Sequence, residues 1–117
     1  MTPGGRSWFR ELLALYDFGF ASRVRTWQRW YAGTPYEYVE RFVPAQGHVV
    51  DLGCGWGLFA NLLALKAPGR TVHGIDLAAK KISWAQRTVG TRPNIHFAVR
   101  DLTTLELERT DAIVIYD

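Results

Sequence analysis

Cysteine is almost absent from this sequence of 117 residues, since Cys54 is the only one. A single cysteine cannot form a disulfide within the chain, and it has no companion at the spacing of a metal site. A disulfide framework and a cysteine-rich metal centre are therefore excluded. A reducing compartment fits this composition best, and we expect a cytoplasmic protein.

Long apolar runs and a strong excess of one charge are also missing. The longest N-terminal candidate, residues 12–20, is interrupted by Asp17, and the opening residues lack the basic, apolar and cleavage regions of a signal peptide. The net charge is +3, with 6 Arg against 4 acids before His48 and 8 Lys and Arg against 7 acids from there on. Neither part is basic enough to indicate nucleic acid as a partner. The hydrophobic fraction of 48% is that of a globular domain.

Residues 1–46 form the first of two predicted domains, a helical segment rich in aromatic side chains. Ser7 stands where it can cap a first helix that ends near Tyr16, and Thr34 begins a capping box for a third. Between them, apolar residues at helical spacing predict a second helix whose apolar face packs on the rest of the domain. The apolar positions are Phe9, Leu12, Leu13 and Tyr16 in the first helix and Phe20, Val24, Trp27 and Tyr31 in the second.

Residues 47–117 form the second predicted domain, in which strands alternate with helices. Successive strand–helix–strand units with apolar strands imply a parallel sheet with helices on its faces, an α/β arrangement of three layers. The predicted strands are 48–52, 71–76, 95–100 and 111–116, and the predicted helices are about 57–66 and 78–89.

Three glycines spaced two apart separate the first of these strands from its helix, in the segment VVDLGCGWGLFANLL. Gly53, Gly55 and Gly57 permit a tight turn and leave room beside the backbone. A strand, a glycine turn and a helix N-terminus together favour a ligand, part of a nucleotide, against the main chain. A dinucleotide fingerprint would require glycine at position 58, where the sequence has Leu58.

An acid followed by this Gly-x-Gly-x-Gly pattern resembles motif I of the class I S-adenosylmethionine-dependent methyltransferases. The resemblance implies a Rossmann-like fold and S-adenosyl-L-methionine as cofactor. It places the turn, Cys54 included, under the methionine part of the cofactor, and Asp51 near its amino group. An ammonium group pairs well with a carboxylate. Cys54 itself is expected to be a small packing residue rather than a nucleophile.

The ends of the next two strands extend the resemblance. The resemblance implies that Asp76 accepts hydrogen bonds from both ribose hydroxyls of the cofactor, and Asp76 could also cap the following helix. Leu77 and Ile82 are implied to lie against adenine. Asp101 and Leu102 are implied to meet the adenine amino group and a ring nitrogen, although Arg100 replaces the common glycine. Asp117 stands near the end of the fourth strand, where relatives face the methyl group.

The family has seven strands in the order 3-2-1-4-5-7-6, and this sequence ends at the fourth, giving a partial sheet in the order 3-2-1-4. We therefore expect a truncated methyltransferase, or a half-domain that completes itself as a homo-oligomer. The acceptor is unknown; a small molecule or a lipid-like compound is expected. No catalytic base or metal site is indicated.

Two other functions stay open. One is a nucleotide-binding oxidoreductase domain that uses NAD, which Leu58 and the acid before the glycines disfavour. The other is a non-enzymatic module that contacts a membrane or a partner through residues 20–31, where arginines alternate with aromatic side chains. These residues are Arg23, Arg25, Trp27, Arg29 and Trp30.

Overall fold

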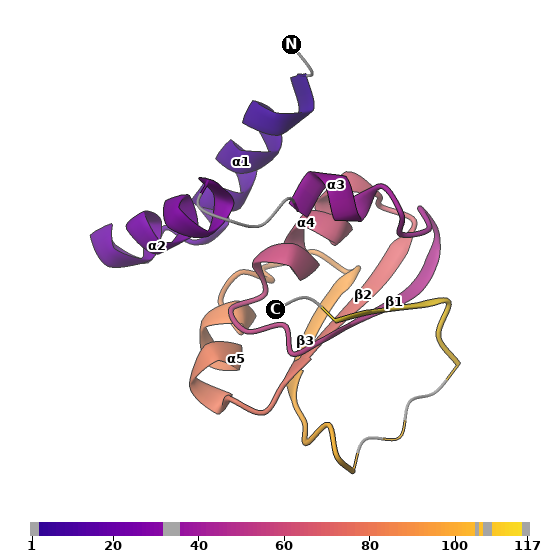
Figure 1. Cartoon of the computed structure of the whole chain (residues 1–117). Helices are drawn as coiled ribbons and strands as arrows, with labels where there is room; N and C mark the ends of the chain where they lie inside the picture. The colour runs from indigo at the N-terminus through magenta and orange to yellow at the C-terminus, as the bar shows by residue number, and fades with distance from the viewer. Residues whose placement is uncertain (1–2, 32–35, 105, 107–108, 116–117) are drawn as a thin grey trace.

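The chain folds into a four-stranded parallel sheet with helices packed against it (Figure 1). The structure is a computed structural model that describes residues 3–31, 36–104, 106 and 109–115. For residues 3–7 and 31 it describes the backbone alone. The strand order is β3-β2-β1-β4, and each neighbouring pair is parallel, which confirms the predicted fold class. The elements are α1 (Pro3–Leu15), α2 (Phe20–Tyr31), α3 (Tyr36–Glu40), β1 (Gly47–Leu52), α4 (Leu58–Lys66), β2 (Arg70–Asp76), α5 (Ala79–Gln86), β3 (Ile95–Val99) and β4 (Ala112–Ile115).

The hydrophobic core lies between one face of the sheet and α4. Val49, Val72 and Ile95 stand on three neighbouring strands and are fully buried, as are Leu62 and Leu63 of α4. Alternate residues of a strand point to opposite faces, so these apolar positions define a single covered face. α5 extends this layer through Ile82 and Ala85. Its helical residues end at Gln86, earlier than the predicted position 89.

The opposite face of the sheet is more open in the described residues. Ile113 and Ile115 of β4 are 53% and 78% exposed. His48, His73 and His96 form a row of stacked rings across β1, β2 and β3 on this face, with ring centroids 6.1 and 4.9 Å apart. Parallel sheets are usually covered on both faces. The expectation of a homo-oligomer stays a prediction, and exposed isoleucines are consistent with it.

The N-terminal helices differ from their prediction in two ways. α1 begins at Pro3, so Ser7 lies inside the helix rather than at its cap. In α2, the face predicted to pack inward is exposed: Phe20, Val24 and Trp27 are 83%, 36% and 54% accessible. The predicted cap at Thr34 and the side chain of Tyr31 lie outside the described residues.

Hydroxyl side chains occupy the inner face of α2 instead. Ser22 and Thr26 are 4% and 3% exposed. The Ser22 hydroxyl donates to the Tyr16 carbonyl at 2.7 Å, and the Thr26 hydroxyl donates to the Ser22 carbonyl at 2.9 Å. Because backbone carbonyls satisfy both hydroxyls locally, their burial carries little desolvation penalty. These short side chains allow α2 to lie close to Tyr16, which is buried with Leu12 at the end of α1.

Arg70, the first residue of β2, ties the sheet to the segment before β1. Its side chain is 2% exposed and forms an ion pair with Glu40 at 2.8 Å. It also donates hydrogen bonds to the carbonyls of Pro44, Leu63 and Val43 at 2.7, 2.9 and 2.8 Å. A buried guanidinium is stable only when its donors are paired, and here several donors have acceptors.

We predict that Arg70→Met lowers the free energy of unfolding by about 3–5 kcal/mol, because it leaves one oxygen of the buried Glu40 carboxylate and three carbonyls without their donor. Urea denaturation measures the change. Arg100→Met, at an exposed arginine, is the matched control and is expected to stay within about 0.5 kcal/mol of wild type. Equal stabilities of the two variants would contradict the anchoring role of Arg70.

Candidate functional site

The site is built where β1 and β2 end side by side. The two strands pair in parallel, with Leu52 opposite Ile75, so the chain leaves both at the same edge of the sheet. The turn after β1 crosses the end of β2, where the amides of Gly53 and Cys54 donate to the Ile75 carbonyl at 2.7 and 3.0 Å. Ligands of open α/β sheets bind at this carboxyl edge.

Asp76 fixes the glycine turn from the end of β2. Its carboxylate accepts the amide of Gly55 at 2.8 Å through one oxygen and the amide of Ala78 at 2.8 Å through the other. Asp76 thus orders both the turn after β1 and the start of α5, although the N-cap residue itself is Ala78. Each carboxylate oxygen can accept more than one hydrogen bond, so Asp76 keeps acceptor capacity for a ligand.

Two positions of the turn are glycine for different physical reasons. Gly57 has φ +85°, and a Cβ there would lie 2.5 Å from the ring of Phe97, so this position needs glycine to pack α4 on β3. Gly55 has φ +59°, and a Cβ there would meet nothing within 4 Å. Gly55 therefore faces open space, as a turn that passes beneath a ligand requires.

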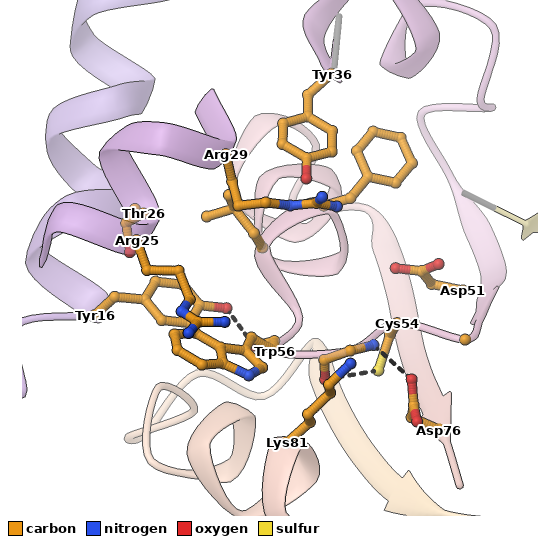
Figure 2. A pocket seen from close by; sticks show the side chains of 14 residues that line it. Tyr16, Arg25, Thr26, Arg29, Tyr36, Asp51, Cys54, Trp56, Asp76 and Lys81 are labelled. Carbon is orange, nitrogen blue, oxygen red and sulfur yellow. Dashed lines mark hydrogen bonds between the residues drawn. The ribbon is translucent and has the colours of Figure 1, made fainter. Parts of the chain in front are cut away.

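This open space is a pocket of about 290 Å³ between the glycine turn and the N-terminal helices (Figure 2). The volume is close to the lower end of the range for small-molecule sites. The sheet domain lines the pocket with two carboxylates, Lys81 and the ring of Trp56, and α2 lines it with two arginines. Its lining residues are Tyr16, Arg25, Thr26, Arg29, Tyr36, Asp51, Gly53, Cys54, Gly55, Trp56, Leu58, Phe59, Asp76 and Lys81.

Asp51 is the most unusual group of the pocket. It is 1% exposed, and its Oδ1 atom has no hydrogen-bond partner among the described residues. Burial and, to a smaller extent, the nearby carboxylate of Asp76 together raise its pKa from 3.8 to about 7. A buried carboxyl oxygen without a donor is costly, so a pocket that holds one is suited to a ligand that supplies a donor or a positive charge.

The N-terminal helices reach the glycine turn through Trp56. The hydroxyl of Tyr16 donates to the Trp56 carbonyl at 2.6 Å and accepts from the Asn61 amide at 2.9 Å. The guanidinium of Arg25 lies 4.3 Å from the centre of the Trp56 ring, which itself stacks on Trp84. Contacts from α1, α2 and α5 therefore converge on the residue between Gly55 and Gly57.

The structure brings together part of the predicted site. Asp51, Gly53, Cys54, Gly55 and Asp76 line one pocket, while Gly57 lies beneath it as a packing position. Burial raises the pKa of the Cys54 thiol, which agrees with a packing role rather than a nucleophile.

The remaining predicted residues lie outside this pocket. Ile82 is 3% exposed and belongs to the core, whereas Leu77 and Leu102 are 66% and 44% exposed. Asp101 is exposed and accepts from the amide and hydroxyl of Thr103 at 2.9 and 2.7 Å. Asp117 lies outside the described residues, so its role and the adenine contacts stay predictions.

Sequence reasoning missed the helix side of the pocket. Tyr16 was assigned to a core face, and Arg25 and Arg29 were assigned to a basic aromatic stretch beside a membrane or solvent. The basic aromatic stretch of α2 was the available signal. Helical periodicity, however, does not show that its arginines face the glycine turn, which lies far along the chain. In the described part, no cluster of three metal-ligating side chains occurs and no helix is long and apolar enough to cross a membrane.

Comparison with known proteins agrees with this geometry. A family model described as a methyltransferase domain matches residues 49–117. YqeM of Bacillus subtilis is 34% identical over 88 residues, which cover 72% of this chain and 34% of that protein. The trans-aconitate 2-methyltransferase of Paracidovorax citrulli is 41% identical over 58 residues, which cover 50% of this chain and 21% of that enzyme.

Solved structures give the same result for the fold. A coclaurine N-methyltransferase bound to N-methylheliamine and SAH superposes with a TM-score of 0.61 at 25% identity, covering 68% of this chain and 24% of that one. A TehB-like SAM-dependent methyltransferase from Corynebacterium glutamicum gives a TM-score of 0.63 at 23% identity, covering 89% and 55%. The chain belongs to the methyltransferase domain family. It spans about a third or less of the length of the curated relatives it matches.

The buried Asp51 predicts a distinctive pH dependence of stability. Its folded-state pKa is about 7 against 3.8 in the unfolded chain, so between these values the folded chain holds a proton that the unfolded chain releases. Stability is therefore lost as the pH rises through this window, by about 2–3 kcal/mol between about pH 5 and about pH 8. Urea denaturation across this range measures the loss.

Asp51→Asn is expected to remove that loss, because an amide has no charge to desolvate. Asp101→Asn is the control: this exposed carboxyl accepts two hydrogen bonds from Thr103, which lower its pKa below 3.8, out of the window. The control should keep the wild-type profile. If Asp51→Asn also keeps it, Asp51 is not the group that titrates.

Proposed function

We propose that this chain is the cofactor-binding part of an S-adenosylmethionine-dependent methyltransferase with a small-molecule acceptor. The observation that carries the proposal is the unpartnered Oδ1 of Asp51, buried in a pocket beside a glycine turn. The amino-acid end of S-adenosylmethionine brings an ammonium group, which supplies the donor and the positive charge that this oxygen lacks.

The other lining residues fit the rest of the cofactor. The carboxylate beside the ammonium needs a cation, and Arg29 extends from α2 toward the side of the pocket where Asp51 lies (Figure 2). Asp76, ordered by the amides of Gly55 and Ala78, has acceptor capacity left for the ribose hydroxyls. Neutral ring systems of the lining, among them Tyr36 and Phe59, offer apolar surface.

The reaction needs little from the protein beyond position. S-adenosylmethionine would supply an electrophilic methyl group, which an acceptor atom held in line with the carbon–sulfur bond could take while the sulfonium became a neutral thioether. Holding the two reactants in this geometry supplies much of the rate enhancement. Matched relatives include a trans-aconitate 2-methyltransferase and a ubiquinone biosynthesis O-methyltransferase, and their different acceptors support the reaction type without selecting a substrate.

We predict that Gly55→Ala abolishes binding of S-adenosylhomocysteine, because its methyl group enters the open space beside the turn. Gly90→Ala is the matched control, since Gly90 has φ +56° and equally open surroundings but lies outside the pocket lining. Both variants should lose about 1–2 kcal/mol of stability from the left-handed backbone. Calorimetric titration with S-adenosylhomocysteine and, separately, with NADH measures binding.

Wild type and Gly90→Ala are expected to bind S-adenosylhomocysteine and not NADH. Unchanged binding by a folded Gly55→Ala variant would place the cofactor elsewhere. Binding of NADH alone would favour the oxidoreductase alternative.

We further propose, as a second function, that the outer face of α2 contacts an anionic membrane surface. Its support is the exposure of the apolar side chains of Phe20, Val24 and Trp27 on one side of a helix that contains no acidic residue. Such a composition is typical of helices that lie in the lipid interface.

Trp27→Gln should weaken co-sedimentation of the whole chain with phosphatidylserine vesicles by about tenfold, because it removes an aromatic side chain that would be buried in the lipid interface. Phe42→Gln is the control, since Phe42 is 72% exposed on a different segment. Equal losses for both variants, or no binding by wild type, would contradict the assignment.

A further inference from the structure

We propose that the methyl acceptor is an anionic small molecule whose negative group binds Arg25, with Lys81 on the other wall of the same pocket. This inference rests on the proposed function and names the acceptor class. It depends on the charges that line the pocket and on the way Arg25 is held.

The first step is the balance of charge in the pocket. Its lining holds two carboxylates, Asp51 and Asp76, and three cations, Arg25, Arg29 and Lys81. The cofactor would bring a sulfonium, an ammonium and a carboxylate, and therefore a net positive charge. Its ammonium uses Asp51 and its carboxylate uses one cation. The occupied pocket then keeps two cations and the sulfonium against one carboxylate, Asp76, and this positive excess favours an anionic second substrate.

The second step is that these cations have no carboxylate partner in the described ranges. The ion pairs found there join Arg23 to Asp17 and join Lys66 and Arg70 to Glu40. Arg23 lies on the same helix as Arg25, but it does not line the pocket. The two neighbouring arginines of α2 therefore differ in their environment, which provides an internal control.

The third step is the fixed position of Arg25. Its guanidinium lies over the Trp56 ring at 4.3 Å, and Trp84 stacks on that ring at 5.6 Å with planes 7° apart. Stacking uses the flat face of a guanidinium, so its N–H donors, which lie in the plane, stay directed sideways. A carboxylate or a phosphate accepts such donors in pairs. Figure 2 shows Arg25 and Trp56 on one side of the pocket and Asp51 on the other, so the anion would be held apart from the cofactor's ammonium group.

The test uses the whole chain loaded with S-adenosylhomocysteine, at fixed ionic strength. Calorimetry measures the binding of malonate, of inorganic phosphate as a second anion, and of malonamide as a neutral analogue of malonate. The variants are Arg25→Gln, Lys81→Gln and, as the matched control, Arg23→Gln. Binding of S-adenosylhomocysteine is measured first for every variant.

We expect malonate or phosphate to bind and malonamide not to bind. Arg25→Gln should weaken anion binding by about tenfold or more, because one charge-assisted pair of hydrogen bonds is lost, while Arg23→Gln binds as wild type does. Lys81→Gln should weaken it less, since an ammonium makes no bidentate contact. Preference for phosphate over malonate would assign a phosphate ester as the anionic group.

Three results would overturn the inference. They are equal binding of malonamide and malonate, equal losses in Arg25→Gln and Arg23→Gln, and no anion binding to a chain that does bind S-adenosylhomocysteine. The last result leaves the proposed function intact. Failure of the wild-type chain to bind S-adenosylhomocysteine would instead overturn the proposed function, and this inference with it.

Discussion

The turn from β1 into α4 is the constraint on which the site depends. It must reverse the chain within a few residues while lying against β2, and it is held there by the Ile75 carbonyl and the Asp76 carboxylate. Gly57 allows α4 to begin in contact with Phe97, and Gly55 leaves space above the turn. The same geometry places Asp51 at the base of the pocket, buried and short of one hydrogen-bond donor. Packing and binding thus share a single backbone path.

The N-terminal helices complete the pocket although they precede the residues that the family model matches. Tyr16 directly follows α1, and its hydroxyl links the Trp56 carbonyl to the side chain of Asn61 in α4. α2 then crosses the opening with Arg25 and Arg29 on its inner side. A methyltransferase needs one wall for the cofactor and another for the acceptor. Here the sheet domain supplies both carboxylates and Lys81, while α2 supplies two arginines. This arrangement of charges is the basis for placing the cofactor's ammonium group at Asp51 and the anionic acceptor at Arg25.

Much of the sheet and of the cofactor side was predictable because its causes are local. Alternating apolar residues define strands, and glycines with positive φ define the turn, whatever lies around them. The positions of Asp51 and Asp76 followed from the ends of two strands that meet at one edge. The prediction for α2 was wrong because a helix with an apolar face and a hydroxyl face can dock by either. Ser22 and Thr26 face inward since carbonyls of the same segment satisfy their hydroxyls.

The sequence by itself determined the strands, the glycine turn and the acids that flank it, since each depends on residues close together in the chain. The order of the strands followed from the resemblance to the family. Only the tertiary structure decided that α2 presents arginines to the pocket and leaves Phe20 and Trp27 exposed. It also decided that Asp51 is buried near Asp76 with its Oδ1 atom unpartnered, and this burial and proximity raise its pKa to about 7. Both results depend on contacts between segments distant in sequence, and no local pattern encodes the dielectric surroundings or the partners of a side chain.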